Sequence, residues 1–230
     1  MAVNRSLIDF STKEDLYFSQ PRPEMMQYIP AVAKRILDVG CGEGVFGAQL
    51  KQRNQAEVWG IELEPAIAEQ AAKRLDKVLC GDVSQQLQSL PEKYFECAIF
   101  NDVLEHLADP YSVLRTIRQK LAPGGVIVCS IPNVRFFRNL FNLVVRGQWR
   151  YEEAGIMDKT HLRFFTKKSI REMFDSLNYH ILKLEGINAT PSWRVRLLML
   201  GTFGLVNDTQ YLQFACVAQP SLTTTSRANC

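Results

Sequence analysis

Short apolar runs alternate with helix-like stretches along most of the chain. Five runs from Arg35 onward are short, rich in β-branched residues and bounded by turn residues, namely RILDV, EVWGI, KVLC, CAIFN and GVIVCSI. These features predict buried strands. Between them, apolar residues recur every three or four positions, which predicts helices. The alternation of strand and helix predicts a parallel sheet with right-handed crossovers.

Two of the predicted helices are defined by their apolar stripes. Pro65 suits a first helical turn, and the stripe after it consists of Ile67, Ala71 and Leu75. The second stripe runs up to the glycines of APGG, which suit a helix end, and it consists of Val113, Leu114, Ile117 and Leu121.

The pattern changes after Asn133. Residues 134–165 contain aromatics, arginines and a polar centre without strand character, which predicts a lid insertion after strand five. Thr166 can then cap a helix with an apolar stripe, and YHILKLEGI and YLQFACVAQ resume strand character. We therefore expect an α/β, Rossmann-like sheet of seven mostly parallel strands flanked by helices, with the last strand antiparallel. The stripe consists of Ile170, Met173, Phe174 and Leu177.

Length and composition favour one domain. The chain has 230 residues, of which 47% are hydrophobic and 22% charged, which allows one sizeable core. We expect a single domain over residues 1–220, in which 1–34 form an N-terminal cap and 134–165 the lid. The polar tail, residues 221–230, is expected to be disordered.

The net charge and the cysteine content indicate which partners and which cellular compartment to expect. A net charge of +3, from 27 basic and 24 acidic residues, gives no reason to expect nucleic acid binding. The six cysteines lack CxxC spacing and no signal peptide is evident, so we expect reduced thiols and a cytoplasmic protein. No apolar stretch reaches the roughly 18 residues of a membrane span.

The clearest chemical signal is the glycine loop ILDVGCGEG, residues 36–44. Residues 42–47 match GxGxxG, and Glu62 lies 20 residues after Gly42, as a ribose-binding acid of an NAD(P)-dependent oxidoreductase would. However, the carboxylates of Asp38 and Glu43 would repel a pyrophosphate. A ligand with an amine and a sulfonium, such as S-adenosylmethionine, suits this loop better.

Several motifs in order resemble those of class I S-adenosylmethionine-dependent methyltransferases: ILDVGCGEG, GIELEP, CGDV and FECAIFNDVLEHLADP. The resemblance extends from about Tyr17 to Gln219. It implies that the glycine loop approaches the methionine part of the cofactor and that Glu62 binds the ribose hydroxyls. Asp82 and Val83 would border the adenine, and Asn101 and Asp102 would close the site. The implied cofactor-binding set is Asp38, Gly40, Gly42, Gly44, Glu62, Leu63, Asp82, Val83 and Asn101.

The expected reaction is in-line transfer of a methyl group to an oxygen or nitrogen nucleophile, leaving S-adenosylhomocysteine. The stretch GQWRYEEAGIMDKTHLRFFT resembles a narrower bacterial subgroup that often modifies small molecules or glycans, so a small-molecule or glycan-type acceptor is expected. Two alternatives remain: an NAD(P)-binding oxidoreductase and a non-catalytic S-adenosylmethionine-binding module.

Two histidines are the candidates for catalysis. His161 follows strand five in DKTHLRFF, near the rim where the acceptor should arrive, and it is the leading candidate for the base that removes the acceptor's proton. The alternative is that His161 only anchors the lid. His106 is the second candidate. Tyr151 and Arg163 are candidates for acceptor binding.

A divalent metal site is a further alternative. Asp102, Glu105 and His106 have the spacing i, i+3 and i+4, which gathers side chains on one helical face. A similar D/E-x-x-E-H arrangement occurs with a divalent metal in ubiquinone-pathway O-methyltransferases and in small-RNA 3′-end methyltransferases, and His161 resembles the later histidine of the latter. EHL also occurs in this superfamily without a metal.

The sequence contains two apolar segments whose contact surface it does not determine. In residues 134–146, apolar residues at helical spacing are interleaved with Arg135, Arg138 and Arg146, and Trp193 to Leu205 is similarly apolar. Such a helix can lie on an anionic membrane surface. Alternatively, the apolar stripe packs on the sheet or on a second subunit of a homodimer.

Overall fold

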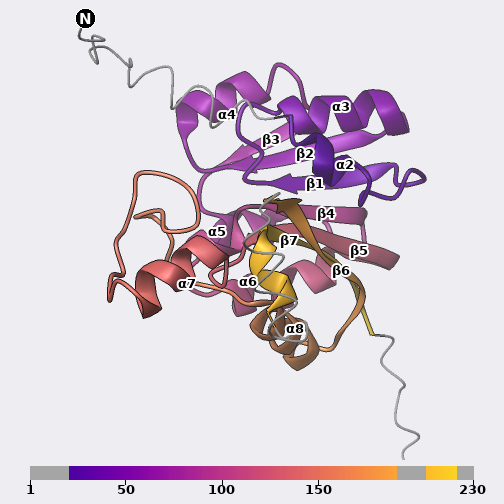
Figure 1. The fold of residues 1–230 in the computed structure, drawn as a ribbon. Coiled ribbons are helices and arrows are strands. Elements are labelled where there is room, and N and C mark those ends of the chain that lie inside the picture. Colours follow the sequence, from indigo (N-terminus) through magenta and orange to yellow (C-terminus); the bar gives the residue numbers. More distant parts are fainter. Residues whose placement is uncertain (1–20, 191–205, 222–230) are drawn as a thin grey trace, which may run out of the picture.

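The computed structural model describes residues 21–190 and 206–221, and a seven-stranded sheet lies at its centre (Figure 1). The strand order is β3-β2-β1-β4-β5-β7-β6. Neighbouring strands among β1 to β5 are parallel, whereas β7 is antiparallel to both β5 and β6. This confirms the predicted fold. The strands are β1 (Arg35–Val39), β2 (Glu57–Glu62), β3 (Lys77–Cys80), β4 (Phe95–Asn101), β5 (Leu121–Pro132), β6 (Tyr179–Ala189) and β7 (Tyr211–Pro220).

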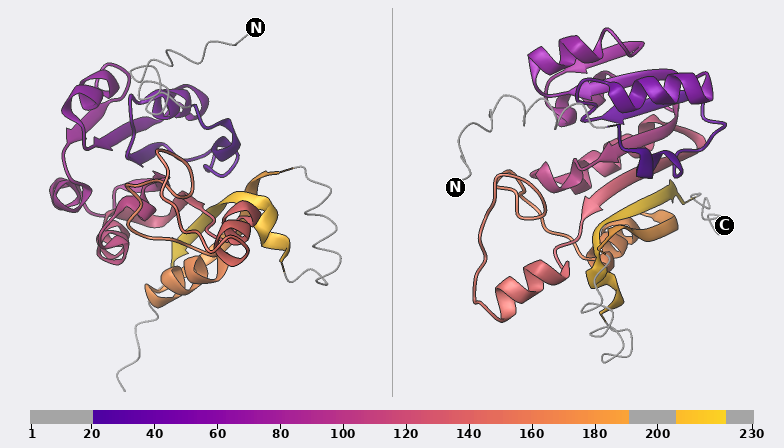
Figure 2. Two further views of the ribbon diagram at one scale, coloured as in Figure 1. Left: turned by 60° about the vertical axis from the view of Figure 1, so that its left-hand side comes forward. Right: turned by 45° about the horizontal axis from the view of Figure 1, so that its top comes forward.

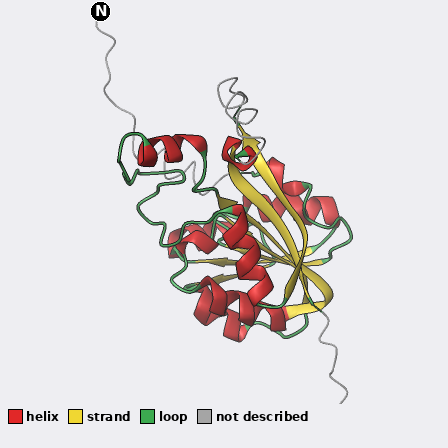
Figure 3. Ribbon diagram, turned by 60° about the horizontal axis from the view of Figure 1, so that its bottom comes forward, coloured by secondary structure: helices red, strands yellow, loops and turns green. Residues whose placement is uncertain are grey.

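Helices cover both faces of the sheet (Figure 3), and each face has its own apolar core. On one face, Phe46, Leu50 and Ala71 pack on the strands; on the other, Leu114, Ile117 and Phe174 do so. The α-helices are α2 (Pro23–Met26), α3 (Val45–Asn54), α4 (Pro65–Ala71), α5 (Val83–Gln86), α6 (Pro110–Lys120), α7 (Phe137–Val144) and α8 (Lys167–Ser176). Short 3-10 turns are η1 (Leu87–Ser89), η2 (Leu104–His106) and η3 (Asn207–Gln210).

Two predicted helix ends are wrong. Helix α4 ends at Ala71, so Leu75 is buried beyond the helix and not on its last turn. Helix α6 ends at Lys120, and Leu121 with the APGG sequence belongs to β5. Leu121 pairs with Phe95 across the sheet, so strand pairing overrides the helical spacing. By contrast, α8 begins as predicted, because the Thr166 side chain caps it by accepting from the Ser169 N–H.

The insertion contains one helix and a long irregular loop. It begins at the carboxyl end of β5 and ends at a β-bridge between Asn133 and Phe165. Helix α7 and this loop stand away from the body of the sheet (Figures 1 and 2). Within the described ranges, no helix is both long enough and apolar enough to cross a membrane.

Several expectations concern residues outside the described ranges. These are the first part of the N-terminal cap (1–20), most of the apolar segment after Trp193 (191–205) and the polar tail from 222 onward. Five cysteines fall within the described residues, and all five are free.

Candidate functional site

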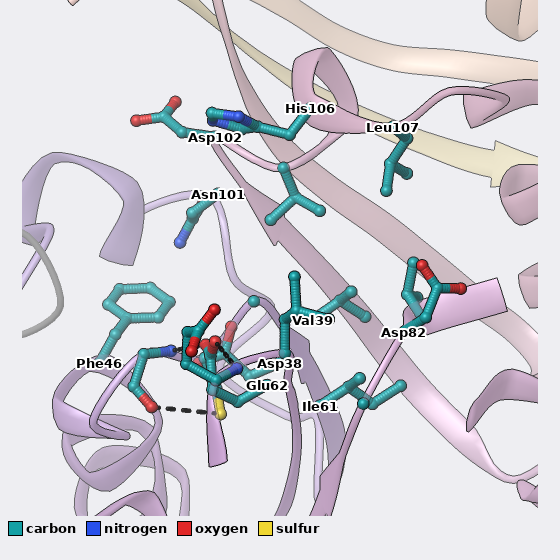
Figure 4. A pocket seen from close by; sticks show the side chains of 18 of the residues that line it. Asp38, Val39, Phe46, Ile61, Glu62, Asp82, Asn101, Asp102, His106 and Leu107 are labelled. Atoms are coloured by element: carbon teal, nitrogen blue, oxygen red, sulfur yellow. Dashed lines mark hydrogen bonds between the residues drawn. The ribbon is translucent and has the colours of Figure 1, made fainter. Parts of the chain in front are cut away.

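A cavity of about 410 Å³ opens at the carboxyl ends of β1, β2 and β4, where an open α/β sheet binds its ligand. Figure 4 shows Asp38 and Glu62 together on one side and Asn101, Asp102 and His106 on the opposite side. Eight of the nine predicted cofactor-binding residues line it; Gly44 does not. The lining residues are Arg22, Asp38, Val39, Gly40, Cys41, Gly42, Phe46, Ile61, Glu62, Leu63, Glu64, Gly81, Asp82, Val83, Asn101, Asp102, Val103, His106, Leu107 and Thr160.

The glycine loop is held in a conformation that requires glycine. Gly40, Gly42 and Gly44 all have positive φ angles, of 67°, 54° and 78°. A Cβ on Gly40 would lie 2.6 Å from the Val103 side chain, so this glycine also allows the loop to approach the segment after β4. Gly44 precedes the first residue of α3 and therefore shapes the loop without lining the cavity.

Glu62 at the end of β2 fastens the loop. Its Oε2 accepts from the Gly42 N–H at 2.9 Å and its Oε1 from the Glu64 N–H at 3.1 Å. The residue is 6% exposed. Each carboxylate oxygen retains a further lone pair, so Glu62 can hold the loop and still accept from a ligand hydroxyl.

Asp38 at the end of β1 has an oxygen without a partner. The residue is 3% exposed, and no described group donates to its Oδ2. Burial, with the neighbouring Glu62 carboxylate as a second cause, raises the pKa of Asp38 to about 7. Across the cavity, the buried Oδ1 of Asn101 also lacks a partner. Asp38 and Asn101, which both line the cavity, therefore each contain a buried acceptor without a partner, and a cationic donor would satisfy both.

Glu43 does not share this environment, although it lies in the same loop. Its carboxylate is 3.5 Å from the Arg74 guanidinium, and Glu43 is not among the lining residues. The second acid beside Asp38 is Glu62, whose carboxylate contributes to the raised Asp38 pKa. The expected pair of carboxylates is therefore present, but with a different second member.

Asp102 is fixed by residues from distant parts of the chain. Its Oδ1 accepts from the Ser130 hydroxyl and from the Gln213 side-chain amide, each at 2.7 Å. Its other oxygen forms an ion pair with Arg22. The backbone is held at a φ of 52°, outside the usual range for a residue with a side chain. Asp102 therefore serves as a fixed point in the cavity wall.

His106 lines the cavity, and His161 lies behind it. The Nδ1 of His106 is 3.0 Å from the Thr160 hydroxyl and 3.3 Å from the Thr160 carbonyl oxygen. The two imidazole rings meet edge to face with centroids 4.6 Å apart. His161 is 8% exposed, and its Nδ1 is 3.0 Å from the Ile156 carbonyl oxygen. Burial and His161 lower the pKa of His106 below its ordinary value, which favours a neutral ring that can accept a proton.

Glu105 completes a cluster with the two histidines. Ligand atoms of Glu105, His106 and His161 all lie within 4.8 Å of one another. Both carboxylate oxygens of Glu105 are buried without a hydrogen-bond partner, and burial, with Asp102 as a second cause, raises the Glu105 pKa well above its usual range. Asp102 is not in the cluster. Of the four predicted metal ligands, Glu105, His106 and the later histidine His161 therefore lie together, and Asp102 lies outside the group.

The predicted acceptor-binding residues lie outside the cavity lining. Tyr151 is 48% exposed, and its ring faces that of Phe164 at 6.2 Å. The Arg163 guanidinium donates to the Ala108 carbonyl oxygen. The Arg163 backbone N–H donates to the Glu105 carbonyl oxygen. Arg163 therefore ties the insertion to the segment around His106.

Ten lining residues were not among the predicted site residues, and they include Arg22, Phe46, Leu107 and Thr160. Thr160 is the lining residue that the insertion contributes. The chemistry of the neighbouring His161 predicts a role at the site, whereas a threonine gives no comparable signal. Phe46 and Leu107 belong to apolar patterns that normally indicate core positions.

The pattern that defines a family of methyltransferase domains matches residues 13–184. The ubiquinone biosynthesis O-methyltransferase of Aeromonas salmonicida is 26% identical over 167 residues, which cover 69% of this chain and 68% of that protein. The same enzyme of Cereibacter sphaeroides is 27% identical over 175 residues, which cover 72% and 68%. A solved S-adenosylmethionine-dependent methyltransferase from Archaeoglobus fulgidus has the same fold, with a TM-score of 0.69, 21% identity and coverage of 91% of this chain and 99% of that chain.

Because the family match spans well over half of the chain, the chain belongs to this family of methyltransferase domains. With the seven-stranded fold, this makes it a class I S-adenosylmethionine-dependent methyltransferase. The family decides against the nicotinamide-dependent alternative that the GxGxxG pattern had raised.

Proposed function

We propose that the enzyme transfers the methyl group of S-adenosylmethionine to a hydroxyl oxygen of a small molecule. The observation that carries this proposal is that one cavity joins His106 to the two unpartnered acceptors, Asp38 and Asn101. A cation-binding side and a proton-accepting side therefore face each other. The relatives named as ubiquinone biosynthesis O-methyltransferases support oxygen as the methylated atom.

The cofactor residues each have a role that matches their chemistry. Asp38 and Asn101 would accept from the ammonium group, and Glu62 would accept from the ribose hydroxyls while it keeps hold of Gly42. Asp82, whose side chain caps α5 by accepting from Ser84, would border the adenine together with Val83. The bound cofactor supplies the activated methyl group on its sulfonium.

The acceptor would enter beside His106. A neutral imidazole held through Nδ1 at Thr160 leaves Nε2 to take the acceptor's proton. His161 would keep the His106 ring in position through their edge-to-face contact. The remaining contribution is proximity and alignment, because in-line transfer needs the hydroxyl oxygen opposite the leaving sulfur.

The acceptor class can be tested with methyl-labelled S-adenosylmethionine. The purified enzyme would be offered matched phenols, sugars and amines of similar size, and the transferred label would be identified by mass spectrometry. Methylation of hydroxyl oxygens supports the proposal. Labelling of the amines alone would replace oxygen by nitrogen as the acceptor atom.

Cofactor affinity is expected to rise with pH through the range around pH 7. Asp38 has a raised pKa of about 7, so it is largely protonated below that pH and must lose its proton to pair with the ammonium. Affinity for S-adenosylhomocysteine should increase up to about tenfold per pH unit below pH 7 and level off above it. Calorimetric titrations between pH 6 and 8 measure this.

Asp38→Asn should bind more weakly and without this pH dependence. Asp82→Asn serves as the matched control, because Asp82 lines the same cavity away from Asp38, and it should keep the wild-type slope. An unchanged slope in Asp38→Asn would remove Asp38 from the ammonium site.

A divalent metal ion is a second candidate at this site. Glu105, His106 and His161 would hold it, since a carboxylate and two imidazoles converge there and both Glu105 oxygens lack partners. A bound ion would lower the pKa of an acceptor hydroxyl. His106 would then be a ligand to the ion and not the base.

Manganese is expected to raise the melting temperature of the wild-type protein if this site binds metal. At a concentration one hundred times the dissociation constant, the added stability is about 2.7 kcal/mol. Glu105→Gln should lose the shift, whereas Glu152→Gln, on the exposed insertion, should keep it. An equal shift in both variants, or turnover indifferent to chelation, excludes the cluster as a metal site.

A further inference from the structure

Helix α7 presents its apolar side outward. On its exposed side, Val144 is 77% exposed, Val145 at the helix end 65% and Phe141 48%. The polar Asn139 points the other way, with its side-chain nitrogen buried. A helix packed on a core has the opposite arrangement. Figures 1 and 2 show α7 at the outer end of the insertion, away from the sheet.

The charges within and next to this helix in the sequence are positive; in the fold, Arg135 forms an ion pair with Asp208 at 3.2 Å and Arg138 one with Glu152 at 3.9 Å. Residues 134–151 contain four arginines and no acidic residue. Arg138 and Arg146 are exposed, and Arg146 lies over the Phe141 ring, 5.2 Å from its centroid. Trp149, which is 41% exposed, follows the helix and contacts the Phe164 ring. Exposed aliphatic side chains, a tryptophan and flanking arginines form the composition of a helix at a lipid–water interface.

We propose that α7 and its flanking arginines bind the surface of an anionic phospholipid membrane. The apolar residues would enter the boundary between headgroups and acyl chains, and the arginines would extend to the phosphates. A second copy of the chain fits this surface less well, because a symmetric contact would bring the same arginines of two subunits together.

The position of α7 links the membrane to the cavity. The insertion that carries α7 also contributes Thr160 to the cavity lining and rests against the Glu105 backbone through Leu162 and Arg163. A helix lying on the membrane would therefore keep the cavity close to the lipid surface. It follows, if the proposed hydroxyl methylation is correct, that the acceptor is an amphipathic molecule that partitions into lipid.

Vesicle co-sedimentation of the full chain tests the proposal. The probes are vesicles of phosphatidylcholine alone and of equal parts phosphatidylcholine and phosphatidylglycerol. We expect binding to the anionic vesicles that falls as salt is raised. Each exposed arginine contributes about a five-fold gain in partitioning, so Arg138→Ala with Arg146→Ala should lower it about 25-fold. Val144→Glu with Val145→Glu should lower it at least as much.

The matched control is Val32→Glu, because Val32 is an equally exposed valine, 82%, away from α7; it should bind vesicles as the wild type does. Affinity for S-adenosylhomocysteine in solution should be unchanged in all these variants. If the wild-type protein does not bind S-adenosylhomocysteine, that result counts against the proposed function and not against membrane binding. Equal binding of wild type and α7 variants overturns the proposal. So does a concentration-dependent dimer in sedimentation that Val144→Glu with Val145→Glu abolishes.

Discussion

Replacement of His106 by alanine is expected to lower kcat by about 10²–10⁴-fold. The imidazole lines the cavity and is oriented at Nδ1 by Thr160, and alanine offers neither a proton acceptor nor a metal ligand. Affinity for S-adenosylhomocysteine should change little, because Asp38 and Glu62 lie on the opposite side of the cavity. Single-turnover kinetics with a responsive acceptor measure the first quantity and calorimetry the second.

The matched control for this prediction is His161→Ala. His161 is buried outside the cavity lining and acts on it through the His106 ring, so its removal should cost less in kcat than removal of His106. If His161→Ala is the more damaging variant while its melting temperature and cofactor affinity stay at wild-type values, the two roles are reversed. His161 would then be the base, as its place in the sequence predicts.

Glu62→Ala is expected to weaken cofactor binding by about 1–3 kcal/mol, which is roughly 5- to 150-fold in affinity. The loss has two causes. The ribose hydroxyls lose a charged acceptor, and the Gly42 and Glu64 N–H groups lose the carboxylate that fixes the loop. Calorimetric titration with S-adenosylhomocysteine gives the value directly.

Glu43→Ala provides the control from the same region of sequence. Its carboxylate faces Arg74 outside the cavity lining, so its loss should leave cofactor affinity at the wild-type value. The cofactor affinity of Glu62→Gln should lie between those of Glu62→Ala and Glu43→Ala, because an amide retains one acceptor oxygen. Wild-type affinity in Glu62→Ala would remove Glu62 from the ribose site.

The sheet could be predicted from the sequence because its central strands are mostly apolar. Buried strands read as continuous apolar runs, and each of the five predicted runs lies within or overlaps a strand. The prediction of burial is wrong for KVLC, because it forms the edge strand β3, whose four residues are exposed or half-buried. The end of α6 could not be predicted in this way. Leu121 continues the helical spacing, and only its pairing with Phe95, far away in sequence, assigns it to β5.

The candidate site was predictable where strands end and unpredictable where the insertion folds back. Glu62 and Asn101 are the last residues of their strands and Asp38 is the last but one of β1, so the topology brings all three to the carboxyl ends of the strands. Whether Thr160 or His161 faces the cavity depends on the path of an irregular loop. The sequence also does not predict the place of Glu43, because closeness in sequence to Asp38 does not reveal that the Glu43 carboxylate pairs with Arg74.

The order of strands also bears on how the enzyme is made. Of the seven strands, β7 is synthesised last, yet it lies between β5 and β6. While the ribosome is still adding residues, β5 therefore presents a bare apolar edge, and β6 has no neighbour to pair with. Gln213 on β7 is also one of the groups that fix Asp102. The glycine loop can thus be assembled early in folding, whereas the opposite wall of the cavity waits for the last strand to insert.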